Sequence, residues 1–160
     1  MYFAVIVIIL IYIFFNLITT SIIMKIAFHP QKLTVDYSIP NTRKVLYNNI
    51  SIIHTDVEDK SKKWLIYSHG NSQTLSGMKQ TINFFGKYFN VVFYDYPEYG
   101  ESGGVLTYDN AIKSSQEVVD YIKKLYSIGN NFCLYGYSLG GFFASCQAVY
   151  LKNMNIEPKN

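Results

Sequence analysis

The sequence has few of the features that mark metal-binding or nucleic-acid-binding proteins. Only two of its 160 residues are cysteines, Cys133 and Cys146, and their separation does not match the spacing of metal ligands. No run of five basic residues occurs, and the formal net charge is only +3. We therefore expect two buried free thiols, no metal, no cofactor and no nucleic-acid partner.

Charged residues are absent from the first 24 positions, which are strongly apolar. Every residue from Tyr2 to Phe15 is aliphatic or aromatic, and about 20 apolar residues suffice to cross a hydrocarbon core of about 30 Å. We predict a single transmembrane anchor over residues 1–24, with the lipid bilayer as a partner. The nearest basic residues all follow this run, beginning with Lys25, which favours a cytosolic main domain. A cleaved signal peptide is the alternative, but no basic residue precedes the run.

Strands and helices alternate in the rest of the chain, residues 25–160. Short alternating pieces between His29 and Val57 predict edge strands that start a sheet. After them, continuous apolar runs predict buried strands, and apolar stripes spaced three and four apart predict helices. This order is typical of an α/β fold with a mostly parallel, doubly wound sheet, in which ligands bind at the carboxyl ends of the strands. The predicted strands are 63–68, 90–95 and 132–135, and the predicted helices are 73–89, 107–125 and 139–151.

The last predicted strand runs into the pattern G-x-S-x-G, which spans Gly136 to Gly140. A strand, this pattern and then a helix are typical of the nucleophile elbow of serine hydrolases, in which a strained turn lifts the serine above the sheet. Ser138 is that serine. Its two flanking glycines are expected to lack side chains because strand and helix backbones nearly touch there. A chance glycine-rich turn is the alternative, and the adjoining strand and helix argue against it.

Three motifs together resemble the α/β-hydrolase superfamily and, within it, the membrane-associated branch that includes protein depalmitoylases. They are SHGN at Ser68–Asn71, YDYPEYGESGG at Tyr94–Gly104 and GYSLGG at Gly136–Gly141. The resemblance covers roughly Trp64 to Leu151. One departure is Glu98, which stands where many relatives have glycine.

The resemblance implies a role for each of several residues in these motifs. Ser138 would be the nucleophile, and the backbone N–H groups of Leu139 and Asn71 would form the oxyanion hole. The first of these donors lies at a predicted helix N-terminus, which favours a developing negative oxygen.

Other residues of the same motifs have supporting roles by this resemblance. His69, Gly70 and Tyr137 are expected to line the binding pocket. In the family, the histidine before glycine shapes its loop and is not the general base. Asp95 resembles a structural aspartate of the turn and is not expected to be the triad acid.

No histidine follows Ser138, although the triad order in this superfamily is serine, acid, histidine. The sequence therefore predicts a partial domain over residues 25–160, truncated after the helix that follows the elbow. A serine hydroxyl without an adjacent base is a poor nucleophile, so we expect little activity from this chain alone.

The function expected from these features is that of a membrane-anchored serine hydrolase acting on carboxylic esters or thioesters. Acylated lipids and S-acylated proteins are the substrates that a bilayer anchor suggests. Two alternatives stay open. One is a non-catalytic relative that serves as a membrane-tethered binding module, and the other is a serine peptidase of the same fold.

Overall fold

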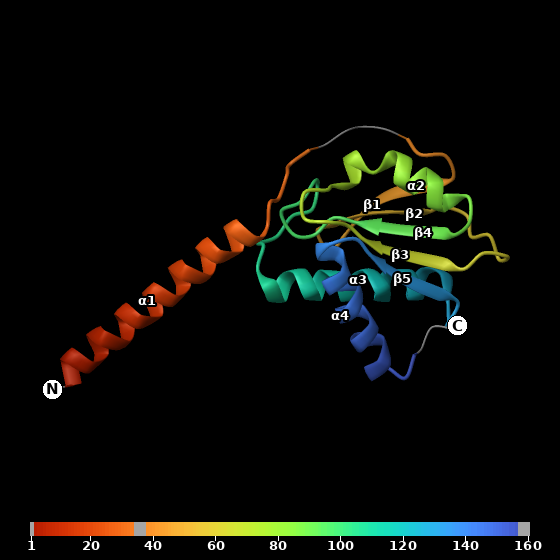
Figure 1. Ribbon diagram of the computed structural model, residues 1–160. Helices are drawn as coiled ribbons and strands as arrows, with labels where there is room; N and C mark the ends of the chain where they lie inside the picture. The colour runs from red at the N-terminus through yellow and green to blue at the C-terminus, as the bar shows by residue number, and fades with distance from the viewer. Residues whose placement is uncertain (1, 34–37, 157–160) are drawn as a thin grey trace.

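A computed structural model describes residues 2–33 and 38–156, with the backbone alone described at residues 2–4, 20, 21, 24 and 25. The chain forms a mixed α/β domain preceded by a long helix (Figure 1). Its elements in order are α1 (Tyr2–Ala27), β1 (Thr42–Tyr47), β2 (Ile50–Thr55), β3 (Trp64–Ser68), the 3₁₀ helix η1 (Leu75–Gly77), α2 (Lys79–Gly86), β4 (Asn90–Tyr94), α3 (Tyr108–Tyr126), β5 (Phe132–Gly136) and α4 (Leu139–Asn153).

The five strands form one sheet in the order β1-β2-β4-β3-β5. The predicted α/β class is confirmed, and β3 pairs in parallel with both β4 and β5. The prediction of a mostly parallel sheet is wrong, because β2 is antiparallel to both of its neighbours, β1 and β4. Of the two strands β1 and β2, only β1 lies at the edge of the sheet. The reason is a hairpin: Asn48 and Asn49 both have positive φ, 46° and 64°, as the tight turns between antiparallel strands require.

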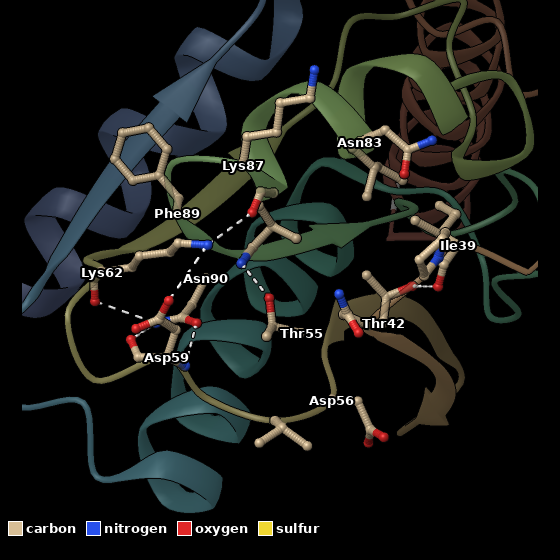
Figure 2. Close-up of a pocket in the computed structure, with 16 residues that line it drawn as sticks. Ile39, Thr42, Thr55, Asp56, Asp59, Lys62, Asn83, Lys87, Phe89 and Asn90 are labelled. Carbon is tan, nitrogen blue, oxygen red and sulfur yellow. Dashed lines mark hydrogen bonds and ion pairs between the residues drawn. The ribbon is translucent and has the colours of Figure 1, made fainter.

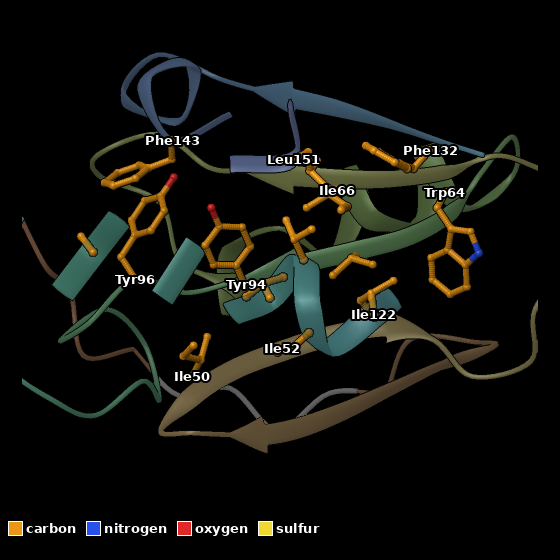
Figure 3. Packing of buried hydrophobic residues seen from close by; sticks show 14 of the residues in the cluster. Ile50, Ile52, Trp64, Ile66, Tyr94, Tyr96, Ile122, Phe132, Phe143 and Leu151 are labelled. Carbon is orange, nitrogen blue, oxygen red and sulfur yellow. The ribbon is translucent and has the colours of Figure 1, made fainter. Parts of the chain in front are cut away.

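Helices cover both faces of this sheet (Figure 1). Helix α2 packs through Ile82 onto a smaller apolar cluster on one face. Helices α3 and α4 cover the main core on the other face, where Ile122 and Phe143 lie among the inward side chains of the strands (Figure 3). Strands covered on both sides need continuous apolar runs, which explains the composition of β3 and β4.

Helix α1 extends away from the sheet (Figure 1) and contains the predicted anchor apart from Met1, which lies outside the described residues. Its described side chains from residue 5 to residue 18 are all exposed. Among the residues described in full, no helical stretch is long and apolar enough to cross a membrane.

Of the helices predicted after the first two buried strands, one is confirmed and one differs from its predicted bounds. Helix α3 is confirmed, with the Thr107 hydroxyl accepting a hydrogen bond from Asn110 N–H at 3.1 Å as its N-cap. The continuous helix predicted over 73–89 is wrong, since η1 and the shorter α2 replace it. Leu75 N–H donates to the Asp95 carboxylate at 2.9 Å, so this donor is engaged by a neighbouring loop.

Candidate active site

The centre of the candidate site is Ser138, which lies between the carboxyl end of β5 and the first residue of α4. Its backbone has φ 52° and ψ −118°. A non-glycine residue in this region is strained and persists only when the surrounding structure holds it there. The side chain is exposed, so the strained turn presents a hydroxyl at the edge of the sheet.

The two glycines of the pattern hold this turn closed. A Cβ added at Gly136 would overlap the backbone of Gly140, so the end of β5 and the start of α4 touch directly. A Cβ at Gly140 would lie 2.8 Å from His69 O and closer still to Ser68 O, in the loop after β3. The sequence pattern predicted the close contact between strand and helix, and the structure adds a third backbone segment, at Ser68 and His69, that also leaves no space for a methyl group.

Two backbone N–H groups, one at the start of α4 and one in the loop after β3, have no hydrogen-bond acceptor among the described residues. Leu139 begins α4, and neither its N–H nor that of Asn71 donates a hydrogen bond to another described residue. Tyr137 N–H donates to Ser68 O at 3.0 Å, which fixes the elbow against the loop that carries Asn71. Unpaired N–H groups at a helix N-terminus favour a negative oxygen.

The loop after β3 is braced from several sides. Gly70 N–H donates to Gln73 Oε1 at 2.8 Å, and the ring of Tyr137 packs so closely that a Cβ on Gly70 would lie 2.9 Å from it. His69 is buried, donates through Nδ1 to Gly70 O at 2.8 Å, and has Nε2 3.3 Å from the Asp95 carboxylate. The half-exposed Tyr137 stands above the loop, while His69 and Gly70 lie beneath the surface.

Two residues that brace this region were not among those singled out in the sequence. Gln73 lies just past the first motif, and Tyr99 lies within the second. The Tyr99 ring is fully buried, and burial raises the pKa of its hydroxyl to about 12. The sequence contains a hint only for Tyr99, which lies within a motif. A contact between side chains far apart in the chain produces no periodic pattern in the sequence, so the roles of these two residues could not be predicted.

None of the three histidines in the sequence is hydrogen-bonded to the Ser138 hydroxyl in the described structure. Buried His54 donates from Nδ1 to Thr55 O at 2.7 Å and accepts from the Tyr121 hydroxyl at 3.2 Å, and burial lowers its pKa. His29 accepts a hydrogen bond from the Asn71 amide at 3.2 Å. The general base that Ser138 needs is therefore not in place among these residues.

Metal-binding side chains do not gather in the described part of the chain, where no group of three His, Cys, Asp or Glu residues forms. Cys133 and Cys146 are free, but both are half-buried where full burial was expected. Partial burial raises the pKa of each thiol, so neither is an activated nucleophile.

A cavity of about 470 Å³, shown in Figure 2, is lined by none of the residues of the elbow. Asn90, the first residue of β4, is part of its wall, so it opens at the amino ends of the parallel strands. Polar groups of its wall already interact with one another. The Lys62 ammonium pairs with the Asp59 carboxylate, and the Asn90 side-chain amide donates to the backbone oxygen of Asp59 at 2.8 Å. This cavity is not part of the Ser138 site.

Comparison with known proteins identifies the family. Residues 12–159 match the family model described as Chlamydia CHLPS protein (DUF818). The chain belongs to the DUF818 family. The uncharacterized protein R595 of Acanthamoeba polyphaga mimivirus is 31% identical to this chain over 119 residues. That match covers 72% of this chain and 39% of the mimivirus protein.

The fold of this DUF818 chain resembles part of the α/β-hydrolase fold seen in solved structures. The Pyrococcus furiosus esterase Pf2001 matches with a TM-score of 0.57 and 22% identity, over 72% of this chain and 48% of the esterase. An esterase of Pyrobaculum calidifontis matches with a TM-score of 0.57 and 15% identity, over 75% of this chain and 42% of that chain. An M. tuberculosis esterase matches with a TM-score of 0.53 and 21% identity, over 74% and 39%. This chain thus spans less than half of each of these proteins.

Proposed function

We propose that this chain carries the nucleophile and the oxyanion hole of a serine hydrolase that acts on carboxylic esters or thioesters. The observation that supports this most strongly is the strained Ser138 at the start of α4, held by glycines whose backbones touch. Ser138 Oγ would attack the carbonyl carbon, and the oxygen would become an anion between Leu139 N–H and Asn71 N–H.

The reaction has two halves. In the first, the serine proton passes to a general base, an alcohol or thiol leaves, and an acyl group stays on Ser138 Oγ. In the second, water attacks this acyl group and releases a carboxylic acid. Both halves need a general base, and no described residue is in place to serve as one, so in this proposal the base comes from outside the described residues. Similarity to esterases of the same fold supports ester chemistry, and the substrate's acyl group is part of the proposal.

Hydrolysis of a p-nitrophenyl ester and of the matching thioester by the natural gene product in detergent tests this function. Activity should disappear in Ser138→Ala. The matched control is Ser145→Ala, an exposed serine about two turns further along α4, whose hydroxyl donates to Gly141 O at 2.9 Å. If the two variants lost hydrolytic activity equally, or if both kept it, Ser138 would not be the nucleophile.

A second candidate is a non-catalytic hydrolase relative that serves as a binding module. The observation that favours it is that no described histidine contacts Ser138, while His54 and His69 are buried in other hydrogen bonds and contacts. Without a base, triad enzymes lose several orders of magnitude in rate. In that case the ester assay would show no Ser138-dependent turnover at all.

We further propose that α1 attaches the protein to a membrane and that the substrates are acylated lipids or S-acylated proteins. From Val5 to Ile18 each side chain is exposed, and Asn16 is the only one that is neither aliphatic nor aromatic. A helix that is apolar on all sides is unfavourable in water and suits either a protein core or lipid. A cytosolic position of the main domain follows the basic residues after the run and belongs to this proposal.

A further inference from the structure

The side chain of Asn71 joins the end of α1 to the candidate oxyanion hole. Its Nδ2 donates to Ala27 O at 2.7 Å and to the His29 ring at 3.2 Å. Its Oδ1 accepts from His29 N–H at 3.0 Å and from the Tyr99 hydroxyl at 2.5 Å. Both N–H donors and both acceptor lone pairs of this amide are therefore directed at two segments, the end of α1 with the residues that follow it and the turn after β4.

The segment after α1 is also fixed independently of Asn71. Phe28 is buried in the main core cluster. Gln31 O accepts a hydrogen bond from Gly100 N–H at 2.8 Å, and the Lys32 ammonium donates to Ser102 O at 3.1 Å. Residues 28–32 thus lie along the turn after β4, on the same side as the loop that carries Asn71.

Tyr99 is the shared element of this arrangement. Its hydroxyl donates to Asn71 and accepts from His29 N–H at 3.1 Å, so it bridges the loop and the segment after α1. Its ring is fully buried, which fixes where the hydroxyl lies. Displacing this hydroxyl would break both of its hydrogen bonds and would leave His29 N–H and Asn71 Oδ1 bonded only to each other at this point.

We infer that Tyr99 and His29 are positioning residues, which hold the Asn71 amide so that the backbone N–H of the same residue points into the oxyanion hole. The end of α1 is then part of the structural support of the site. This inference rests on the proposed function for its catalytic consequence, whereas the support of the loop is a property of the fold. Oxyanion donors act only when they are held in position before the charge develops.

The test compares Tyr99→Phe, which removes one hydroxyl and keeps the ring, with the matched control Tyr126→Phe. The Tyr126 hydroxyl donates to Thr55 O at 2.8 Å at the amino ends of the parallel strands, away from the elbow. In the natural gene product, Tyr99→Phe should lower kcat for a p-nitrophenyl ester about tenfold with KM within about twofold. Hydrogen exchange over residues 69–75 should become about tenfold faster. His29→Ala, at an exposed position, should shift both quantities in the same direction by less.

Two results would overturn the inference. One is kcat and exchange in Tyr99→Phe that equal those of Tyr126→Phe, and the other is a rise in KM with kcat unchanged. If the parent protein shows no Ser138-dependent hydrolysis, the proposed function fails. Hydrogen exchange then decides the support role alone, and unchanged exchange over residues 69–75 in Tyr99→Phe would overturn it.

Discussion

The substitution Gly140→Ala tests the closed elbow in a quantitative way. The added Cβ would lie 2.5 Å from Ser68 C and 2.8 Å from His69 O, and closer still to Ser68 O. All of these are backbone atoms, which cannot rotate away as a side chain does. Relief requires α4 or the end of β3 to move, and both elements are packed in the core.

The expected destabilisation follows from this geometry. Overpacking in a tight site costs typically about 1–3 kcal/mol, and a clash with three backbone atoms of Ser68 and His69 belongs at the upper end. For a chain of this length about 3 kcal/mol corresponds to a fall in Tm of about 6–12 °C. The adjacent Gly141 is the matched control, because a Cβ there meets nothing within 4 Å. Gly141→Ala should stabilise the helix by about 0.5–1 kcal/mol, since glycine is the poorer helix former.

The assay uses Trp64, the single tryptophan, which is fully buried in β3 and reports unfolding by fluorescence. Thermal and urea unfolding of the two variants and the parent are compared in the same mild detergent. A Gly140→Ala protein as stable as the parent, or a Gly141→Ala protein as unstable as Gly140→Ala, would refute the contact between the three backbone segments.

Three further predictions concern other parts of the molecule. Because burial lowers the pKa of His54 from 6.5, the unfolded state binds more protons, so the free energy of unfolding should fall as pH drops below about 6.5, less steeply in His54→Gln. Asp95→Ala should cost about 1–3 kcal/mol in urea unfolding, because it removes the buried acceptor of Leu75 N–H; a neutral effect would contradict this role. Helix α1 should keep the protein in the pellet after alkaline carbonate extraction, and a soluble full-length protein would end the membrane proposal.

The elbow was predictable because its chemistry is local. A strained serine, two glycines at fixed offsets, a buried strand before them and a helix after them all fall within 20 residues, so the sequence alone indicates their arrangement. Helix α3 was predictable for a similar reason, since Thr107 caps a stripe of apolar residues.

The missed features depend on contacts between distant residues. Edge strands were predicted between His29 and Val57, but the left-handed conformation of Asn48 and Asn49 turns them into a hairpin whose strand β2 pairs antiparallel with β4. The segment predicted as one helix from residue 73 begins instead with η1, and the N–H of its first residue, Leu75, donates to Asp95, 20 residues away. The bonds of Asn71 to Ala27 and Tyr99 join three separate segments, and no periodic pattern in the sequence records such a contact.

The most direct test of the central claim is fluorophosphonate labelling of the 160-residue chain, with and without added imidazole, followed by mapping of the labelled peptide. The proposed oxyanion hole lies within this chain, while no base contacts Ser138 among the described residues, so labelling should be slow and imidazole should accelerate it. The label should lie on Ser138 alone and disappear in Ser138→Ala. An absence of labelling even with imidazole, or equal labelling of Ser138→Ala, would contradict the claim that Ser138 is the nucleophile.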